Sequence, residues 1–214
     1  MKKTTLMLSA LLIAAMAMGG NEMYYKKMGE ALAQFSSSKS LDDYQDLANH
    51  FQVISGVETA EWLPIYYEAQ CYIMIGFMND LETEKRDSYL AMALTAIDRM
   101  IEMAPREAEI HALAALCYTA SMTINPAERN PGTAPLIYAA LGKALAFEPE
   151  NPRARFISIS NEIGTARFFG SDTAPLCEKA SQLLESWDSY VPKSPLYPTW
   201  GKMQAQGIVN SCGH

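Results

Sequence analysis

The residue types that most often carry catalysis or bind metals are sparse in this sequence and form no catalytic pattern. The histidines, His50, His111 and His214, do not fall in the His-x-x-x-His or His-Glu-x-x-His spacings of helical zinc sites. No Gly-x-Ser-x-Gly elbow and no glycine-rich phosphate loop follows the predicted leader. The carboxylates are scattered, and several fall at predicted helix starts, where they favour the helix dipole. The sequence therefore predicts no catalytic residue, no metal ligand and no cofactor.

The four cysteines fall into two groups. Cys71 and Cys117 occupy equivalent positions in successive repeat units, about 10 Å or more apart, whereas the two Cα atoms of a disulfide lie within about 7 Å. We therefore expect both to be buried and unpaired. Cys177 opens a predicted helix and Cys212 lies at the end of the chain. If the C-terminal segment folds back, these two can form a disulfide; two free thiols are the alternative.

The elements that must position these side chains form a helical repeat. One set of spacings occurs three times, with apolar residues at offsets 0, 4 and 7, which share one helix face, and a proline at offset 12. Because proline cannot continue a helix, each set predicts a helix and its end. The sets are Ala93, Ile97, Met100 and Pro105; Ile137, Leu141, Ala144 and Pro149; and Ala180, Leu184, Trp187 and Pro192.

Matching residues on the preceding helices point to a family. Ala69-Gln70-Cys71-Tyr72 and Ala115-Leu116-Cys117-Tyr118 each place a small residue three positions before a tyrosine. Together with the terminal prolines, they resemble the tetratricopeptide repeat over roughly residues 22–192. The run Pro195-Leu196-Tyr197-Pro198-Thr199-Trp200-Gly201 and the late Cys212 are similar to the tails of small exported repeat proteins of Bacteroidetes-type bacteria.

This resemblance implies an all-α fold, a TPR-like α-α superhelix of antiparallel helix pairs with a C-terminal capping helix. The expected domain spans residues 18–214, in units of about 22–59, 60–105, 106–149 and 150–192 with a cap at 193–214. These units are about ten residues longer than the family's 34. We place the surplus in the turns inside the pairs, near residues 80–84, 125–132 and 164–175.

Two aromatic features of the C-terminal part have expected roles. Phe168 and Phe169 fall in the last of these turns, where they either anchor the turn against neighbouring helices or serve a function. Trp200 is expected to cover the apolar face of the last helix pair, which carries Leu183 and Trp187 and would otherwise be exposed at the end of the stack.

The first helices of stacked pairs line the concave surface of such an array, so we expect the ligand groove there. Aromatic residues beside polar groups on that surface suit peptide recognition. Filling of the core between repeats is the alternative role for these aromatics. The groove candidates are Leu63, Tyr66, Gln70, Ile73 and Met74 from the second unit, Glu109, Ala112, Leu116 and Thr119 from the third, and Arg153, Phe156, Ser160 and Ile163 from the fourth.

The N-terminus and the charge predict an exported chain. Lys2 and Lys3 precede an apolar stretch that contains Ala15-Met16-Ala17, so residues 1–17 read as a signal peptide; an uncleaved N-terminal anchor is the alternative. The stretch is short for a membrane span and no later one replaces it, so we expect no span in the mature chain. The formal net charge of −7 disfavours nucleic acid as a partner.

The sequence thus favours a periplasmic or secreted scaffold that binds a protein or peptide and has no catalytic activity. A structural subunit of a cell-envelope complex is one alternative. A hydrolase or carbohydrate-active enzyme that uses groove carboxylates such as Glu109 and Glu162 is another.

Overall fold

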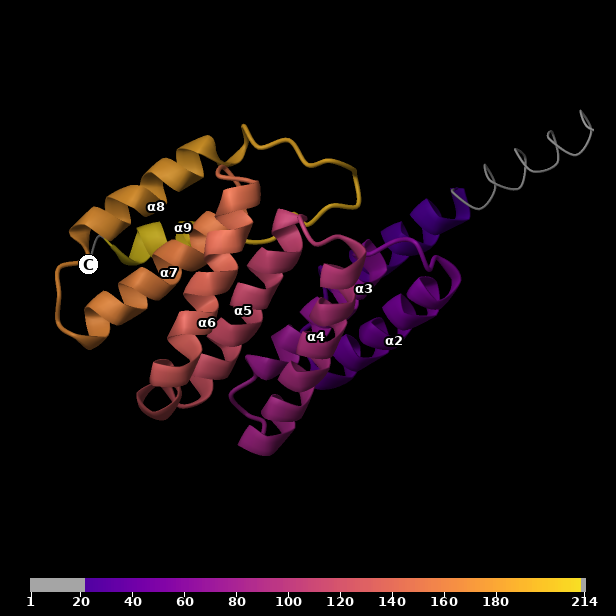
Figure 1. Cartoon of the computed structure of the whole chain (residues 1–214), viewed down its shortest axis with the longest axis horizontal. Coiled ribbons are helices and arrows are strands. Elements are labelled where there is room, and N and C mark those ends of the chain that lie inside the picture. Colours follow the sequence, from indigo (N-terminus) through magenta and orange to yellow (C-terminus); the bar gives the residue numbers. More distant parts are fainter. Residues whose placement is uncertain (1–21, 213–214) are drawn as a thin grey trace, which may run out of the picture.

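The chain is all-α in the computed structural model, which describes residues 22–212 (Figure 1). The predicted signal peptide lies outside these residues. Within them no strand is present, so the predicted fold class is confirmed at this level. Residues 22–35 are helical, and the helices that follow are α2 (Leu41–Val57), α3 (Leu63–Gly76), α4 (Thr83–Met103), α5 (Ala108–Ile124), α6 (Pro126–Phe147), α7 (Pro152–Phe168), α8 (Ala174–Trp187) and α9 (Lys202–Ser211).

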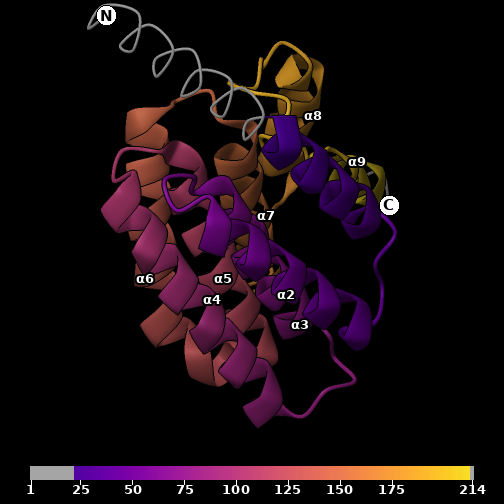
Figure 2. The same ribbon diagram turned by 90° about the vertical axis from the view of Figure 1, so that its right-hand side faces the viewer.

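The helices stack in chain order along the long axis of the molecule (Figure 1). Each of α3, α5 and α7 packs against the helix that follows it, and α5 also contacts both α3 and α7. These three helices therefore form an inner row. Figure 2 shows α4 and α6 together on one side of the stack.

Burial explains why the inner and outer helices have different sequences. Nearly every residue of α3 is buried, because neighbours surround it, and its sequence is apolar on all sides. The outer helix α4 is buried along one stripe only, which includes Ala93, Ile97 and Met100. The recurring apolar residues of α6 and α8 likewise face inward, with Leu184 partly buried.

The surplus length of the third unit lies in its helices, which corrects the expectation of a long turn. Only Asn125 separates α5 from α6. Pro126 opens α6, where its missing N–H is not needed, and Pro131 and Pro135 lie inside the helix. Both internal prolines are exposed, so water can solvate the backbone carbonyl groups that they leave without a partner.

The long segment between α8 and α9 crosses the molecule to α3 and returns (Figure 1). Trp200 at its end packs with the main core around α3, not on the last helix pair as expected. Ala205 and Ile208 of α9 instead join the second core cluster with Leu183 and Trp187. The helix α9 therefore covers the end of the stack, while the segment between α8 and α9 packs against the main core around α3.

Gly76, at the end of α3, provides a test of the packing between α3 and α4. A Cβ atom there would lie 2.4 Å from Cδ2 of the buried Leu90. Gly76→Ala should therefore lower the free energy of unfolding by about 1–3 kcal/mol, as overpacked cores do. Gly142→Ala in α6 is the matched control, since no heavy atom lies within 4 Å of its added Cβ. Urea denaturation should show Gly142→Ala equal to or more stable than the parent chain, and equal loss in both variants would contradict this packing.

None of the helices in the described part of the chain combines the length and apolar character that a membrane span requires.

Candidate functional site

The inner row of helices is covered by the chain's own C-terminal segment. The Tyr67 hydroxyl donates to the carbonyl oxygen of Leu196 at 2.8 Å, and Trp200 Nε1 donates to the Tyr66 hydroxyl oxygen at 2.9 Å. Leu196 is buried in the main core. The segment between α8 and α9 thus occupies the surface where sequence reasoning placed a ligand.

A buried ion pair lies under this segment. Arg153 at the start of α7 donates from Nε to Glu109 Oε2 at 2.6 Å and from Nη2 to Oε1 at 2.5 Å. Asn151 Nδ2 also donates to Glu109 Oε1 at 2.6 Å, and the Tyr190 ring lies 5.1 Å from the Arg153 guanidinium carbon. Arg153 is 1% exposed and Glu109 is 0% exposed. Burial alone would lower the pKa of Arg153, but the hydrogen bonds and charge of Glu109 outweigh it and raise this pKa.

The structure brings the groove candidates together, and it places most of them in the protein interior. They belong to α3, α5 and α7, the inner row, which the C-terminal segment and the neighbouring helices bury. Buried side chains offer no free surface to a peptide in this conformation. Leu63, Tyr66, Gln70, Ile73, Glu109, Ala112, Arg153 and Ile163 are buried, and Met74, Leu116, Thr119, Phe156 and Ser160 are partly buried.

A cavity of about 520 Å³ opens between the second half of α5, the start of α6 and the second half of α7. Of the groove candidates, Thr119 and Ser160 belong to its lining. The other lining residues were not predicted as ligand contacts. They are Met122, Thr123, Pro126, Asn130, Asn161, Gly164, Thr165, Arg167, Phe168 and Phe169.

Several polar side chains of this pocket are already engaged with the protein. Asn161 Nδ2 donates to Thr119 Oγ1 at 3.0 Å and to the Ile157 carbonyl oxygen at 2.9 Å. The Thr119 and Thr123 hydroxyls each donate to a backbone carbonyl of α5. Because these groups have partners, they present little unmet hydrogen-bonding demand to a ligand. The pocket therefore favours a largely apolar ligand.

Two exposed phenylalanines stand at the rim of the pocket. Phe168 ends α7 and Phe169 follows it, with 68% and 69% of their surfaces exposed. Their rings meet edge to face with centroids 5.1 Å apart. They do not anchor a turn against neighbouring helices, because α7 extends through Phe168 and only then turns at Gly170, whose φ of 66° suits glycine.

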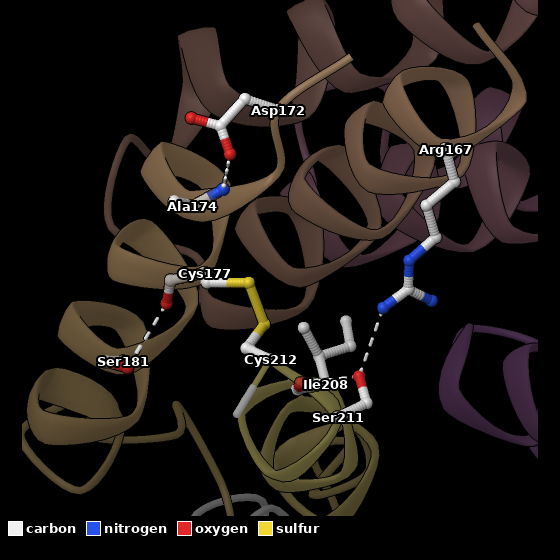
Figure 3. Close-up of a disulfide and its surroundings, with 8 residues drawn as sticks. All are labelled: Arg167, Asp172, Ala174, Cys177, Ser181, Ile208, Ser211 and Cys212. Atoms are coloured by element: carbon white, nitrogen blue, oxygen red, sulfur yellow. Dashed lines mark hydrogen bonds between the residues drawn. A yellow bond between two sulfur atoms is a disulfide. The ribbon is translucent and has the colours of Figure 1, made fainter. Parts of the chain in front are cut away.

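A disulfide joins the first turn of α8 to the residue that follows α9 (Figure 3). Cys177 and Cys212 are bonded, with Cα atoms 5.8 Å apart, so the chain adopts the first of the two states that the sequence left open. Arg167 Nη2 donates to the Ser211 hydroxyl oxygen at 3.3 Å (Figure 3). As predicted, Cys71 and Cys117 are buried and free, and burial raises the pKa of the Cys117 thiol to about 12.

The side chains that could have served as catalytic or metal-binding groups do not lie together in one site. His111 is buried, with Nε2 2.9 Å from the carbonyl oxygen of Pro105. Glu162 receives a hydrogen bond from Lys179 at 3.1 Å on the surface, whereas Glu109 is in the buried ion pair. Across residues 22–212, no group of three or more His, Cys, Asp or Glu side chains is placed to hold a metal ion.

A solved structure of a known protein has a fold similar to that of this chain. No protein-family model and no curated protein matches this sequence. Among solved structures, the chain is similar to the HusA haemophore from Porphyromonas gingivalis, with a TM-score of 0.77 and 25% sequence identity. The match covers 88% of this chain and 92% of that one. The two share an all-helical fold.

Proposed function

We propose that this chain is an exported, non-catalytic binding protein whose pocket between α5, α6 and α7 takes a flat apolar ring of the porphyrin class. The observation that carries this proposal is the pair of exposed phenylalanines, Phe168 and Phe169, at the rim of an apolar cavity. Exposed apolar groups beside a concavity are typical of ligand sites. The similarity to a haemophore supports the choice of ring.

The size and chemistry of the pocket suit one small ligand. Its volume of about 520 Å³ lies within the range of about 300–1,000 Å³ that small-molecule sites occupy. Complete burial of a phenylalanine side chain contributes about 1.5–3 kcal/mol. A ring that covers Phe168 and Phe169 would remove most of their exposed surface from water.

The affinity for a porphyrin should depend more on contact with its ring than on coordination of a bound iron. Haem proteins hold iron through His, Cys, Met or Tyr. Met122 is the one member of this group in the lining of the pocket. A porphyrin without metal should therefore bind about as well as haem.

A protein- or peptide-binding scaffold is less well supported, because its expected concave surface is occupied by the segment that contains Leu196 and Trp200. We propose that the stacked pairs are a divergent tetratricopeptide array adapted to a small ligand. The disulfide between Cys177 and Cys212 supports export to an oxidising compartment, the periplasm or the outside of the cell.

Titration of the purified, oxidised chain with haem and with metal-free protoporphyrin tests this proposal. Absorbance and tryptophan fluorescence should both report saturable binding of one ring per chain. The double variant Phe168→Ala/Phe169→Ala should weaken the affinity for both ligands by at least about tenfold, because it removes the aromatic contact.

The matched control for this titration is Tyr138→Ala. Tyr138 is an aromatic residue of α6 with 47% of its surface exposed, and it is absent from the lining of the pocket. Its removal should leave the affinity unchanged. Absence of saturable binding to either ring, or equal weakening by both substitutions, would overturn the proposed function.

A further inference from the structure

Arg167 differs from every other residue that lines the pocket, because it is the one charged side chain among them. No Asp or Glu lines the cavity. Arg167 is also exposed, and no salt bridge links it to a carboxylate among the described residues. The pocket thus combines apolar walls with one cation that lacks an acidic partner.

The hydrogen bond that Arg167 makes in this structure is long, and its partner is an uncharged hydroxyl group. Its one side-chain hydrogen bond within the described chain runs from Nη2 to the exposed Ser211 hydroxyl at 3.3 Å. A guanidinium has five N–H donors, so most of its donors are available to another group. A carboxylate would accept two parallel hydrogen bonds of about 2.7–2.9 Å, which are roughly twice as strong as neutral ones.

The negative charge of the whole chain makes Arg167 more important for the binding of an anionic ligand. The formal net charge is −7, and loss of Lys2 and Lys3 with the predicted signal peptide would make the chain more acidic. Such a chain repels anions in general. An anionic ligand therefore needs a local positive group, and Arg167 provides one at the edge of the apolar cavity.

We infer that the ligand of this pocket carries a carboxylate on its apolar body, and that Arg167 pairs with that carboxylate. This inference rests on the proposed function, since it assumes that the pocket binds a ring. It makes Arg167 the residue that selects acidic porphyrins over neutral ones. The phenylalanines then provide apolar contact with any ring of this shape. The guanidinium makes the affinity depend on whether the ring carries a carboxylate.

The test compares protoporphyrin, which bears two carboxylates, with its dimethyl ester, in which both are neutral. The parent chain should bind the dicarboxylate about tenfold to a hundredfold more tightly than the ester, as expected for a hydrogen bond between charged groups. Arg167→Gln should remove this difference by weakening the dicarboxylate alone. Arg167→Lys should retain part of it, because the charge remains while the two-point geometry is lost.

Two control variants separate ligand pairing from a structural role of Arg167. Ser211→Ala removes the hydrogen bond to α9 but keeps the guanidinium, so the preference for the dicarboxylate should persist. Arg155→Gln removes a partly exposed arginine at the opposite end of α7, paired with Glu150 at 2.7 Å, and should have no effect on either ligand. The thermal unfolding temperature should be similar in all four variants.

The outcomes for this inference and for the proposed function are distinguishable. If neither ring binds the parent chain, both fail. If the rings bind equally and Arg167→Gln changes nothing, the function stands and the pairing is wrong. If Ser211→Ala abolishes the preference as fully as Arg167→Gln, Arg167 acts by holding α9 and the pairing is again wrong.

Discussion

Arg153→Met should lower the free energy of unfolding by about 3–5 kcal/mol, the usual cost of removing one partner of a buried ion pair. The substitution leaves Glu109, which is 0% exposed, without its two hydrogen bonds from the guanidinium. The remaining donors, Asn151 Nδ2 at 2.6 Å and the Tyr190 hydroxyl at 3.4 Å, are neutral and do not compensate the charge of a buried carboxylate. Urea denaturation followed by circular dichroism measures the loss.

Arg155→Met is the matched control for this large effect. It lies on the same helix, but its side chain and that of its partner Glu150 are much more exposed. Exposed pairs contribute about 0–1 kcal/mol. A double variant, Glu109→Met/Arg153→Met, should recover part of the loss, because no unpaired charge remains. A loss at Arg153 no larger than that at Arg155 would show that the ion pair does not hold the fold.

Removal of the disulfide should have the second large effect. Cys177→Ser/Cys212→Ser should lower the free energy of unfolding by about 3–4 kcal/mol, because the bridge closes a loop with a sequence separation of 35 residues. For a domain of this size, that loss corresponds to a fall of about 10 °C in the melting temperature. Thermal unfolding under oxidising conditions measures it.

Reduction provides the control for the disulfide variant. A thiol reductant should lower the melting temperature of the parent chain to that of the double variant. The same reductant should leave the variant unchanged, since Cys71 and Cys117 are buried and free. A parent chain that melts at the same temperature with and without reductant would contradict a stabilising role for the bridge.

Which face of each outer helix is buried could be predicted, because it depends on local periodicity. Residues at offsets 0, 4 and 7 point the same way on any α-helix, and Ala93, Ile97 and Met100 do so. The end of α6 followed by Pro149 could be predicted for the same local reason. The turn predicted near residues 125–132 was wrong at Pro131, because exposure to water lets this proline remain inside α6.

The candidate site was predicted less well, because a pocket depends on segments that are distant in sequence. Met122, Asn130 and Asn161 come from three helices, and nothing in their local sequence marks them as neighbours. The usable signals were the first-helix positions of Thr119 and Ser160 and the pair Phe168 and Phe169, since two adjacent phenylalanines in a predicted turn required an explanation.

The sequence by itself determined the all-α fold class and the buried faces of the outer helices, since the periodicity of apolar residues and the positions of prolines act within a few turns of chain. It also narrowed the pairing of Cys177 and Cys212 to two states. Only the tertiary structure decided which surface remains free. The segment that contains Leu196 and Trp200 covers the inner row by contacts with Tyr67 and Tyr66, more than 100 residues earlier in the chain. Contacts at that separation depend on the packing of the whole stack, which no local pattern encodes.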